Sequence, residues 1–396
     1  MIYVFGDTRL DLGRHVLTRG GETIPVEPQV FDILHLLAEN AGSLVTKDRL
    51  IEAVWQGRII SEATISARIN AARNAVGDTG RDQRIIRTVP RRGFEMVAAV
   101  TVEADAAPPP APAFRQTIRY AASADGAGIA WSSAGDGPPV LYAWHHLSHL
   151  EKDWASGLHG PALTAFADRR RLIRYDVRGS GLSDPIRPED DLDAHVADMI
   201  AVADAAGLDR FPIVATLQAA AVAIRLAATR PERVSRLVLI NGYARGRATR
   251  ENAPEDSESD PFIALLLSGG WGDPDNGFMR AWATMVLPMA TFDETTELIR
   301  LIAHASSTED VLLQRGLIDR LDVQDDLARV RAPTLVIHAR MCAIHPVAEG
   351  RRVAAGIPGA EFLEVDSSNT FLIASDPAFG RFFDATMEFL DRADGA

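Results

Sequence analysis

A proline- and alanine-rich segment divides this chain of 396 residues into two parts. Residues 104–113 read ADAAPPPAPA, with four prolines and almost no apolar side chain to bury. Such a segment favours extended polyproline structure and acts as a semi-rigid spacer. A chain of this length is also too long for one ordinary core. We therefore expect separate domains at residues 1–100 and 115–396, joined by a linker at 101–114.

Charge differs between the two parts. The net charge of −13 argues against a nucleic-acid partner, because phosphate contacts need Lys and Arg. Residues 1–100, however, carry 13 basic and 12 acidic side chains, against 28 and 42 in the rest of the chain. Between residues 64 and 92 there are seven arginines and two aspartates. Positive charge is therefore concentrated in one segment of an almost neutral first domain.

The first hundred residues predict a small α+β domain. Short segments at 2–5, 9–12, 16–18 and 22–26, separated by glycine-containing turns, predict a small sheet. Apolar residues then recur at helical spacing up to Asn40, and Thr46 and Ser61 are predicted N-caps of helices at 47–55 and 61–76. Residues 84–89 and 94–97 flank the sequence PRRG, which predicts a hairpin with a basic tip.

The helix expected at 61–76 has one apolar face, formed by Ile65, Ile69, Ala72 and Val76, and otherwise small or polar residues. Arg and Asn side chains can make bidentate contacts to guanine and adenine. We therefore predict that this helix and the hairpin contact DNA through Thr64, Ser66, Arg68, Asn70, Arg73, Arg87, Arg91 and Arg92. An ordinary solvated surface that happens to carry arginines is the alternative.

The segments VEPQVFDILHLLAENAGSLVTKDRLIEAVWQGRIISEATISARINAARNAVGD and IIRTVPRRGFEM resemble the OmpR/PhoB-type winged-helix DNA-binding domains. The resemblance covers residues 1–100 and is strongest to ToxR/CadC-like one-component regulators. It implies that 61–76 is the recognition helix in the major groove, and that Arg91 and Arg92 reach an adjacent minor groove or the backbone. We identify no receiver domain before this domain and no membrane segment after it. We therefore expect the signal that controls the regulator to act through another part of the chain.

Strand-like and helical segments alternate after the linker. The strand-like runs are 140–143, 172–176, 211–216, 237–241, 334–338 and 361–365, and the helical stretches between them include 191–206, 218–228 and 347–357. This alternation predicts an α/β fold with a doubly wound, mostly parallel sheet. Residues from about 243 to 331 interrupt the pattern with helical sequence, which predicts an inserted helical cap.

The second domain resembles the α/β-hydrolase family across roughly residues 115–392, on segments such as RLIRYDVRGSGLSD and FPIVATLQAAAVAIRLAATRPERVSRLVLINGYARGR. The resemblance implies a serine nucleophile, an acid and a histidine, and it places Leu217, Cys342 and Thr370 at those positions. Leucine cannot be activated as a nucleophile. We therefore expect no catalytic residues and no enzymatic activity.

A ligand pocket is predicted where the active site would lie. Its expected lining is Trp144, His145, Leu217, Gln218, Trp271, Trp282, Cys342, Thr370 and Phe371. A mostly apolar cavity with a few polar groups is typical of a small-molecule site, although the same side chains could fill a solid core. Cys342 is either a buried small hydrophobe or a thiol sensor. His145, His146 and His149 lack accompanying ligands, so we expect no metal and no cofactor.

These expectations describe a cytoplasmic one-component transcriptional regulator. The chain has one cysteine, no signal peptide is read, and no apolar run is long enough to span a membrane. Expected partners are double-stranded promoter DNA, a small apolar or amphipathic effector and a second copy of the chain; RNA polymerase is a further candidate, and no membrane partner is expected. Two alternatives stay open: an atypical active hydrolase-fold enzyme tethered to DNA, and a second domain that serves only protein interaction or dimerisation.

Overall fold

The computed structural model describes residues 2–12, 16–55, 60–103, 115–250, 270–342 and 344–393. The chain forms two compact units, Met1–Pro109 and Pro110–Ala396, and each is described by itself. Most of the linker predicted at 101–114 lies outside the described residues. Its first three residues form a strand, β8 (Thr101–Glu103), which pairs with β1 (Ile2–Phe5). These three residues therefore belong to a sheet of the first unit, and their prediction as linker was wrong.

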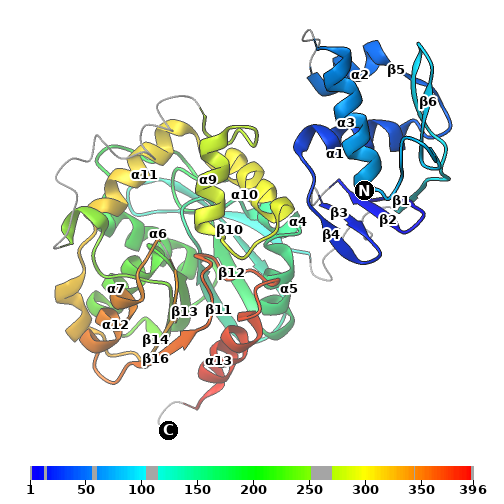
Figure 1. Ribbon diagram of the computed structural model, residues 1–396. Coiled ribbons are helices and arrows are strands. Elements are labelled where there is room, and N and C mark those ends of the chain that lie inside the picture. The colour runs from blue at the N-terminus through cyan, green and yellow to red at the C-terminus, as the bar shows by residue number, and fades with distance from the viewer. Residues whose placement is uncertain are drawn as a thin grey trace. The chain divides into compact units, whose positions relative to one another are not determined.

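In its described residues, the first unit combines two antiparallel sheets with three helices (Figure 1). The larger sheet has the order β4-β3-β2-β1-β8, in which β2 is Thr8–Asp11, β3 is Val16–Arg19 and β4 is Glu22–Ile24. The helices are α1 (Pro28–Glu39), α2 (Lys47–Trp55) and α3 (Glu62–Ala75). The smaller sheet has the order β5-β7-β6, with β5 at Val45–Thr46, β6 at Ile86–Val89 and β7 at Gly93–Met96.

Local sequence signals account for the ends of these helices. Pro28 begins α1, where its missing N–H costs nothing, and Ser61 accepts a hydrogen bond from the Thr64 N–H (3.2 Å) at the start of α3. The apolar face predicted for α3 is buried against α1 in one core with the sheet. The predicted winged helix-turn-helix arrangement is therefore confirmed, with boundaries within about two residues of expectation.

The second unit contains an eight-stranded sheet among its described residues, in the order β16-β15-β14-β13-β11-β12-β10-β9 (Figure 1). The pairs from β12 to β16 are parallel, and only β9 and β10 run antiparallel to their neighbours. The strands are β9 (Thr117–Ala122), β10 (Gly128–Ala134), β11 (Pro139–Ala143), β12 (Arg171–Tyr175), β13 (Phe211–Thr216), β14 (Val234–Ile240), β15 (Thr334–Ala339) and β16 (Glu361–Val365). This confirms the predicted mostly parallel α/β sheet; the antiparallel pair at its edge was missed.

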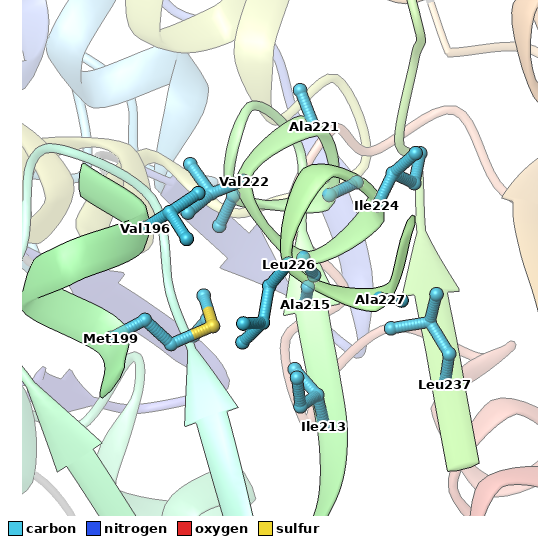
Figure 2. Packing of buried hydrophobic residues seen from close by; sticks show 14 of the residues in the cluster. Val196, Met199, Ile213, Ala215, Ala221, Val222, Ile224, Leu226, Ala227 and Leu237 are labelled. Atoms are coloured by element: carbon cyan, nitrogen blue, oxygen red, sulfur yellow. The ribbon is translucent and has the colours of Figure 1, made fainter. Parts of the chain in front are cut away.

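Helices cover both faces of this sheet, and the alternation of side chains along each strand builds two cores. One face packs against α6 (Leu192–Ala205), α7 (Ala219–Thr229) and α12 (Val347–Gly356). Figure 2 shows part of this core, where Met199 of α6 and Leu226 of α7 lie beside Ile213 of β13. The other face packs against α4 (Leu150–Ala155), α5 (Gly160–Arg169) and α13 (Phe379–Asp391).

Helices also follow β14 and precede β15, at the position predicted for a cap. The described ones are α9 (Gly277–Val286), α10 (Phe292–Ala305) and α11 (Thr308–Arg320), with short 3-10 turns η1 (Arg247–Thr249) and η3 (Gln324–Arg329) on either side. Residues 251–269 of this insertion lie outside the described residues. The cap helices share a core with Leu147, Leu217 and Phe371, which lie at the carboxyl edge of the sheet. The cap therefore covers that edge. None of the helices that the structure describes is both long and apolar enough to cross a membrane.

Candidate functional site

Helix α3 presents a polar face of the first unit to solvent. Thr64, Ser66 and Asn70 are exposed, as predicted for residues that read base edges. The side chain of Arg68 is 30% exposed and forms an ion pair with Glu27 (2.5 Å) and a hydrogen bond to Gln29. Arg68 is therefore held against the start of α1, and a DNA contact would have to compete with Glu27.

The hairpin of β6 and β7 carries the other predicted DNA contacts. Arg91 has φ of 62° at its tip, and both Arg91 and Arg92 are exposed. A Cβ at Gly93 would lie 2.0 Å from the carbonyl oxygen of Val45, so only glycine allows β7 to lie this close to β5. This contact fixes the hairpin next to the helix-turn-helix segment. The structure thus places the two arginines at the tip of a hairpin that packs closely against β5.

Arg73 is wrongly assigned to the DNA-facing set. Its side chain is buried, and it donates hydrogen bonds to the carbonyl oxygen of Ile86 (3.0 and 2.9 Å) and to the hydroxyl of Thr88 (2.8 Å). Arg73 therefore attaches α3 to β6. The helical period placed it on a polar face, but it could not show that β6 covers that face.

Three further arginines of this surface differ from the predicted set of DNA contacts. Arg87, predicted to contact DNA, is exposed but pairs across the hairpin with Glu95 (2.7 Å). Arg81 and Arg84 are exposed in the loop between α3 and β6 and were not predicted as contacts. The local excess of arginine was the sequence signal that could have identified them.

The second candidate site lies where the strand order of the large sheet reverses. After β11 the chain passes by α4 and α5 to β12 on one side, and after β12 it returns by α6 to β13 on the other side of β11. In open α/β sheets such a reversal opens a crevice at the carboxyl ends of the strands. Trp144 to Leu147 follow β11, and Leu217 and Gln218 follow β13.

Leu217 occupies a strained turn between β13 and α7. Its φ is +51°, a conformation that costs a residue other than glycine on the order of 1–3 kcal/mol. The N–H of Leu217 donates to the carbonyl oxygen of Ile240 (3.0 Å), and its own carbonyl accepts from Ala220 (3.1 Å). Ala215 and Ala219, two residues before and after Leu217, are both buried. The turn therefore holds the leucine side chain at the carboxyl edge of the sheet.

A cavity of about 290 Å³ lies between this edge and the cap. Of the predicted lining residues, it is lined by His145, Leu217, Gln218, Trp282, Thr370 and Phe371. It is also lined by Met285 of the cap and by residues that were not predicted to line the pocket: His146, Leu147, Tyr243, Arg247, Val286, Arg315, Ile318, Ile344 and His345. Several of these are on cap helices, whose register over the sheet edge no local sequence pattern specifies.

Three residues predicted to line the pocket do not line this cavity. Trp144 lies on the other face of the sheet with Tyr142 (5.0 Å between ring centroids), because side chains two residues apart share a face. Trp271 packs behind Trp282 and donates to the carbonyl oxygen of Ser306 (3.1 Å). Cys342 is buried behind Thr370, with 3.5 Å between its Sγ and the threonine hydroxyl.

Hydrogen bonds hold the loop that carries Thr370 in place. Asn241 donates to the carbonyl oxygen of Thr370 (2.8 Å) and accepts from the N–H of Ala339 (2.7 Å). Asp376 accepts from the hydroxyl of Ser367 (2.6 Å) and from the side-chain amide of Asn369 (2.8 Å). The cavity wall is therefore set by a buried polar network.

The histidines of the cavity are neutral at pH 7. Burial lowers the pKa of His146 to about 4, with a further contribution from the Arg315 charge. Burial also holds the pKa values of His145 and His345 well below the usual value. Among the described residues, the Nε2 atom of His145 and the Nδ1 atoms of His146 and His345 are buried without a hydrogen-bond partner. The described residues bring no three His, Cys, Asp or Glu side chains together for a metal ion.

Both units match known families. Residues 21–96 match the family model described as transcriptional regulatory protein, C terminal, and residues 141–290 match the model of the alpha/beta hydrolase fold. The first part is similar to transcriptional activator CadC of Escherichia coli, with 29% identity over 85 residues that cover 21% of this chain and 17% of that protein.

The second part is similar to a protein of Azorhizobium caulinodans named "Putative carbamate hydrolase RutD". The two are 27% identical over 237 residues, which cover 59% of this chain and 84% of that protein. The crystal structure of a hydrolase from Pseudomonas aeruginosa superposes with a TM-score of 0.57 at 23% identity, covering 70% of this chain and 99% of that one. This superposition confirms the fold of the second unit.

Proposed function

We propose that this chain, in which an OmpR/PhoB-type winged-helix DNA-binding domain is joined to an α/β-hydrolase-fold domain, is a sequence-specific transcriptional regulator whose second domain binds a small-molecule effector without hydrolysing it. The observation that carries the proposal is the cavity of about 290 Å³ over Leu217. A filled core would have favoured a domain that only mediates protein interaction. The apolar leucine at the turn offers no oxygen or sulfur that could attack a substrate.

The proposal also covers how the two domains work together. An almost neutral DNA-binding domain gains affinity when two copies bind paired half-sites, so the regulator acts as a homodimer on promoter DNA, with RNA polymerase as a further candidate partner. An effector regulates such a dimer only if it binds two conformations or assembly states with different affinity. The cap helices form one wall of the cavity and are the elements whose position a ligand would change.

Filling the cavity is expected to abolish effector binding. A thermal-shift screen of the full chain against a metabolite library should give ligands that raise its melting temperature by about 5 °C or more at 100 times Kd. Leu217→Trp should remove this stabilisation, and so should Met285→Trp, which changes an exposed residue and is the safer variant for folding. Met341→Trp, at an exposed position outside the cavity, is the matched control. A ligand that stabilises both cavity variants as strongly as the wild type would contradict the proposal.

An active hydrolase is the second candidate, and the similarity to the RutD protein favours it. Under our proposal, purified protein should release no product from p-nitrophenyl acetate or from a p-nitrophenyl carbamate above the rate of heat-inactivated protein. The reason is that Leu217 and Thr370 cannot act as a nucleophile and a general base in the way that serine and histidine do. Turnover that is lost in Met285→Trp but kept in Met341→Trp would replace the effector proposal with the enzyme.

A further inference from the structure

The charged groups that line the cavity are positive. Arg247 and Arg315 line it, whereas no aspartate or glutamate of the described residues does. Behind them, Asp319 accepts from the Nε of Arg315 (2.9 Å) and from Arg247 (3.4 Å). One carboxylate thus lies beside the two guanidinium groups that line the cavity.

A third positive contribution comes from α7. Gln218, which precedes this helix of 11 residues, lines the cavity, so the helix N-terminus points toward it. Backbone N–H groups at a helix N-terminus attract negative charge. The N–H groups of Ala220 and Ala221 donate to the carbonyl oxygens of Leu217 and Gln218. The N–H groups of Gln218 and Ala219 are therefore the ones at the start of the helix that a ligand could reach.

Two histidines, His146 and His345, also line the cavity. Burial first, and neighbouring arginines second, lower the pKa values of these rings, so they remain neutral and do not compete with the arginines for an anion. The apolar lining of the cavity includes Leu217, Trp282 and Phe371.

We propose that the cavity takes a small amphipathic anion, with a carboxylate or phosphate monoester head bound by Arg247 and Arg315 and an apolar body against Leu217, Trp282 and Phe371. Arginine suits this role because its planar guanidinium can bind both oxygens of such a head. This inference rests on the proposed effector function and names the chemical class of the effector. Neither arginine was visible as a site residue from the sequence.

The test compares three probes with the same chain length on the full-length protein by isothermal titration calorimetry: octanoate, octyl phosphate and the neutral octanamide. We expect at least one anion to bind about tenfold or more tightly than octanamide, because hydrogen bonds to charged groups contribute that much. The tighter of the two anions identifies the head group. Arg315→Gln and Arg247→Gln should each remove most of this preference and leave octanamide binding unchanged.

Arg320→Gln is the matched control, because it removes the same charge from an exposed position of α11 outside the cavity. Circular dichroism and the melting temperature of each variant check that it folds; since the two arginines are changed separately, one well-folded variant suffices. Equal binding of all three probes by the wild type, or an anion preference that survives both substitutions, overturns the anion site but keeps an effector pocket. If no probe binds and the metabolite screen also finds no ligand, the proposed effector function fails as well.

Discussion

Replacing Asp78 by alanine is expected to destabilise the DNA-binding unit by about 3 kcal/mol or more. The side chain is buried and accepts four backbone hydrogen bonds, from the N–H groups of Thr79 (2.9 Å), Arg84 (3.0 Å), Ile85 (2.9 Å) and Ile86 (2.9 Å). Without the carboxylate these donors lose their partner, and each unsatisfied buried donor costs about 1–3 kcal/mol. Because a domain of this size is stable by only about 5–15 kcal/mol, much of its stability depends on this side chain.

Hydrogen exchange of the full chain, read by mass spectrometry over residues 60–97, measures this effect in the unit concerned. Asp82→Ala, in the same loop but at an exposed position, should leave exchange unchanged. Unchanged protection in Asp78→Ala would show that the loop is not held by the carboxylate.

Asp78 also gives the stability of the unit a defined dependence on pH. Burial raises the pKa of this carboxyl, but the four backbone donors together hold it below the ordinary value of 3.8. The stabilisation is therefore complete above the ordinary value and is lost as pH falls through the folded-state pKa. Acid titration of the wild type should show this loss and Asp78→Asn should not.

The double substitution Arg91→Ala/Arg92→Ala is expected to weaken DNA binding by about a hundredfold, since each arginine contact to a base or phosphate is worth roughly 1–3 kcal/mol. Both side chains are exposed at the tip of a hairpin that Gly93 fixes against β5. Fluorescence anisotropy with a duplex selected from a random library by the full-length protein measures the affinity. Loss of two phosphate contacts per subunit should also reduce the slope of log K against log salt by about 1.8 for each subunit bound.

Arg331→Ala/Arg381→Ala is the control, because it removes the same charge from exposed positions of the hydrolase-fold unit. A similar loss of affinity in this control would mean that overall charge, and not the hairpin, determines binding.

Asn70→Ala should behave differently from both: it should relax sequence preference at one base pair and leave the salt slope unchanged, since a base contact releases no counterion. A uniform loss of affinity across sequences would remove Asn70 from the base-reading set.

Arg73 shows why the set of DNA contacts could be predicted only in part. The helical period of α3 correctly placed Ile65 and Ile69 in the core, because burial of one face follows from the sequence of the helix itself. Whether a residue on another face meets solvent or another strand depends on tertiary packing. Arg73 meets β6 and is buried, whereas Asn70 is exposed.

The residues that line the pocket could likewise be predicted only in part. Alternating strands and helices predicted the sheet, and the position of Leu217 after β13 predicted that it would stand at the carboxyl edge. Trp144 was assigned to the pocket from its place after β11, but the twofold alternation of strand β11 continues through it and turns it to the other face. Arg247 and Arg315 come from the inserted cap, more than 60 residues apart, and only its packing over the sheet brings them to one cavity.

We could predict the two folds, the ends of the helices and the apolar residue at the strained turn from the sequence, because hydrophobic periodicity, capping residues and turn residues act over a few neighbouring positions. Which arginines are exposed to DNA, and which charged side chains line the cavity, could be seen only in the folded structure. Those properties depend on packing between elements that are far apart in the chain, and short-range sequence patterns do not specify that packing.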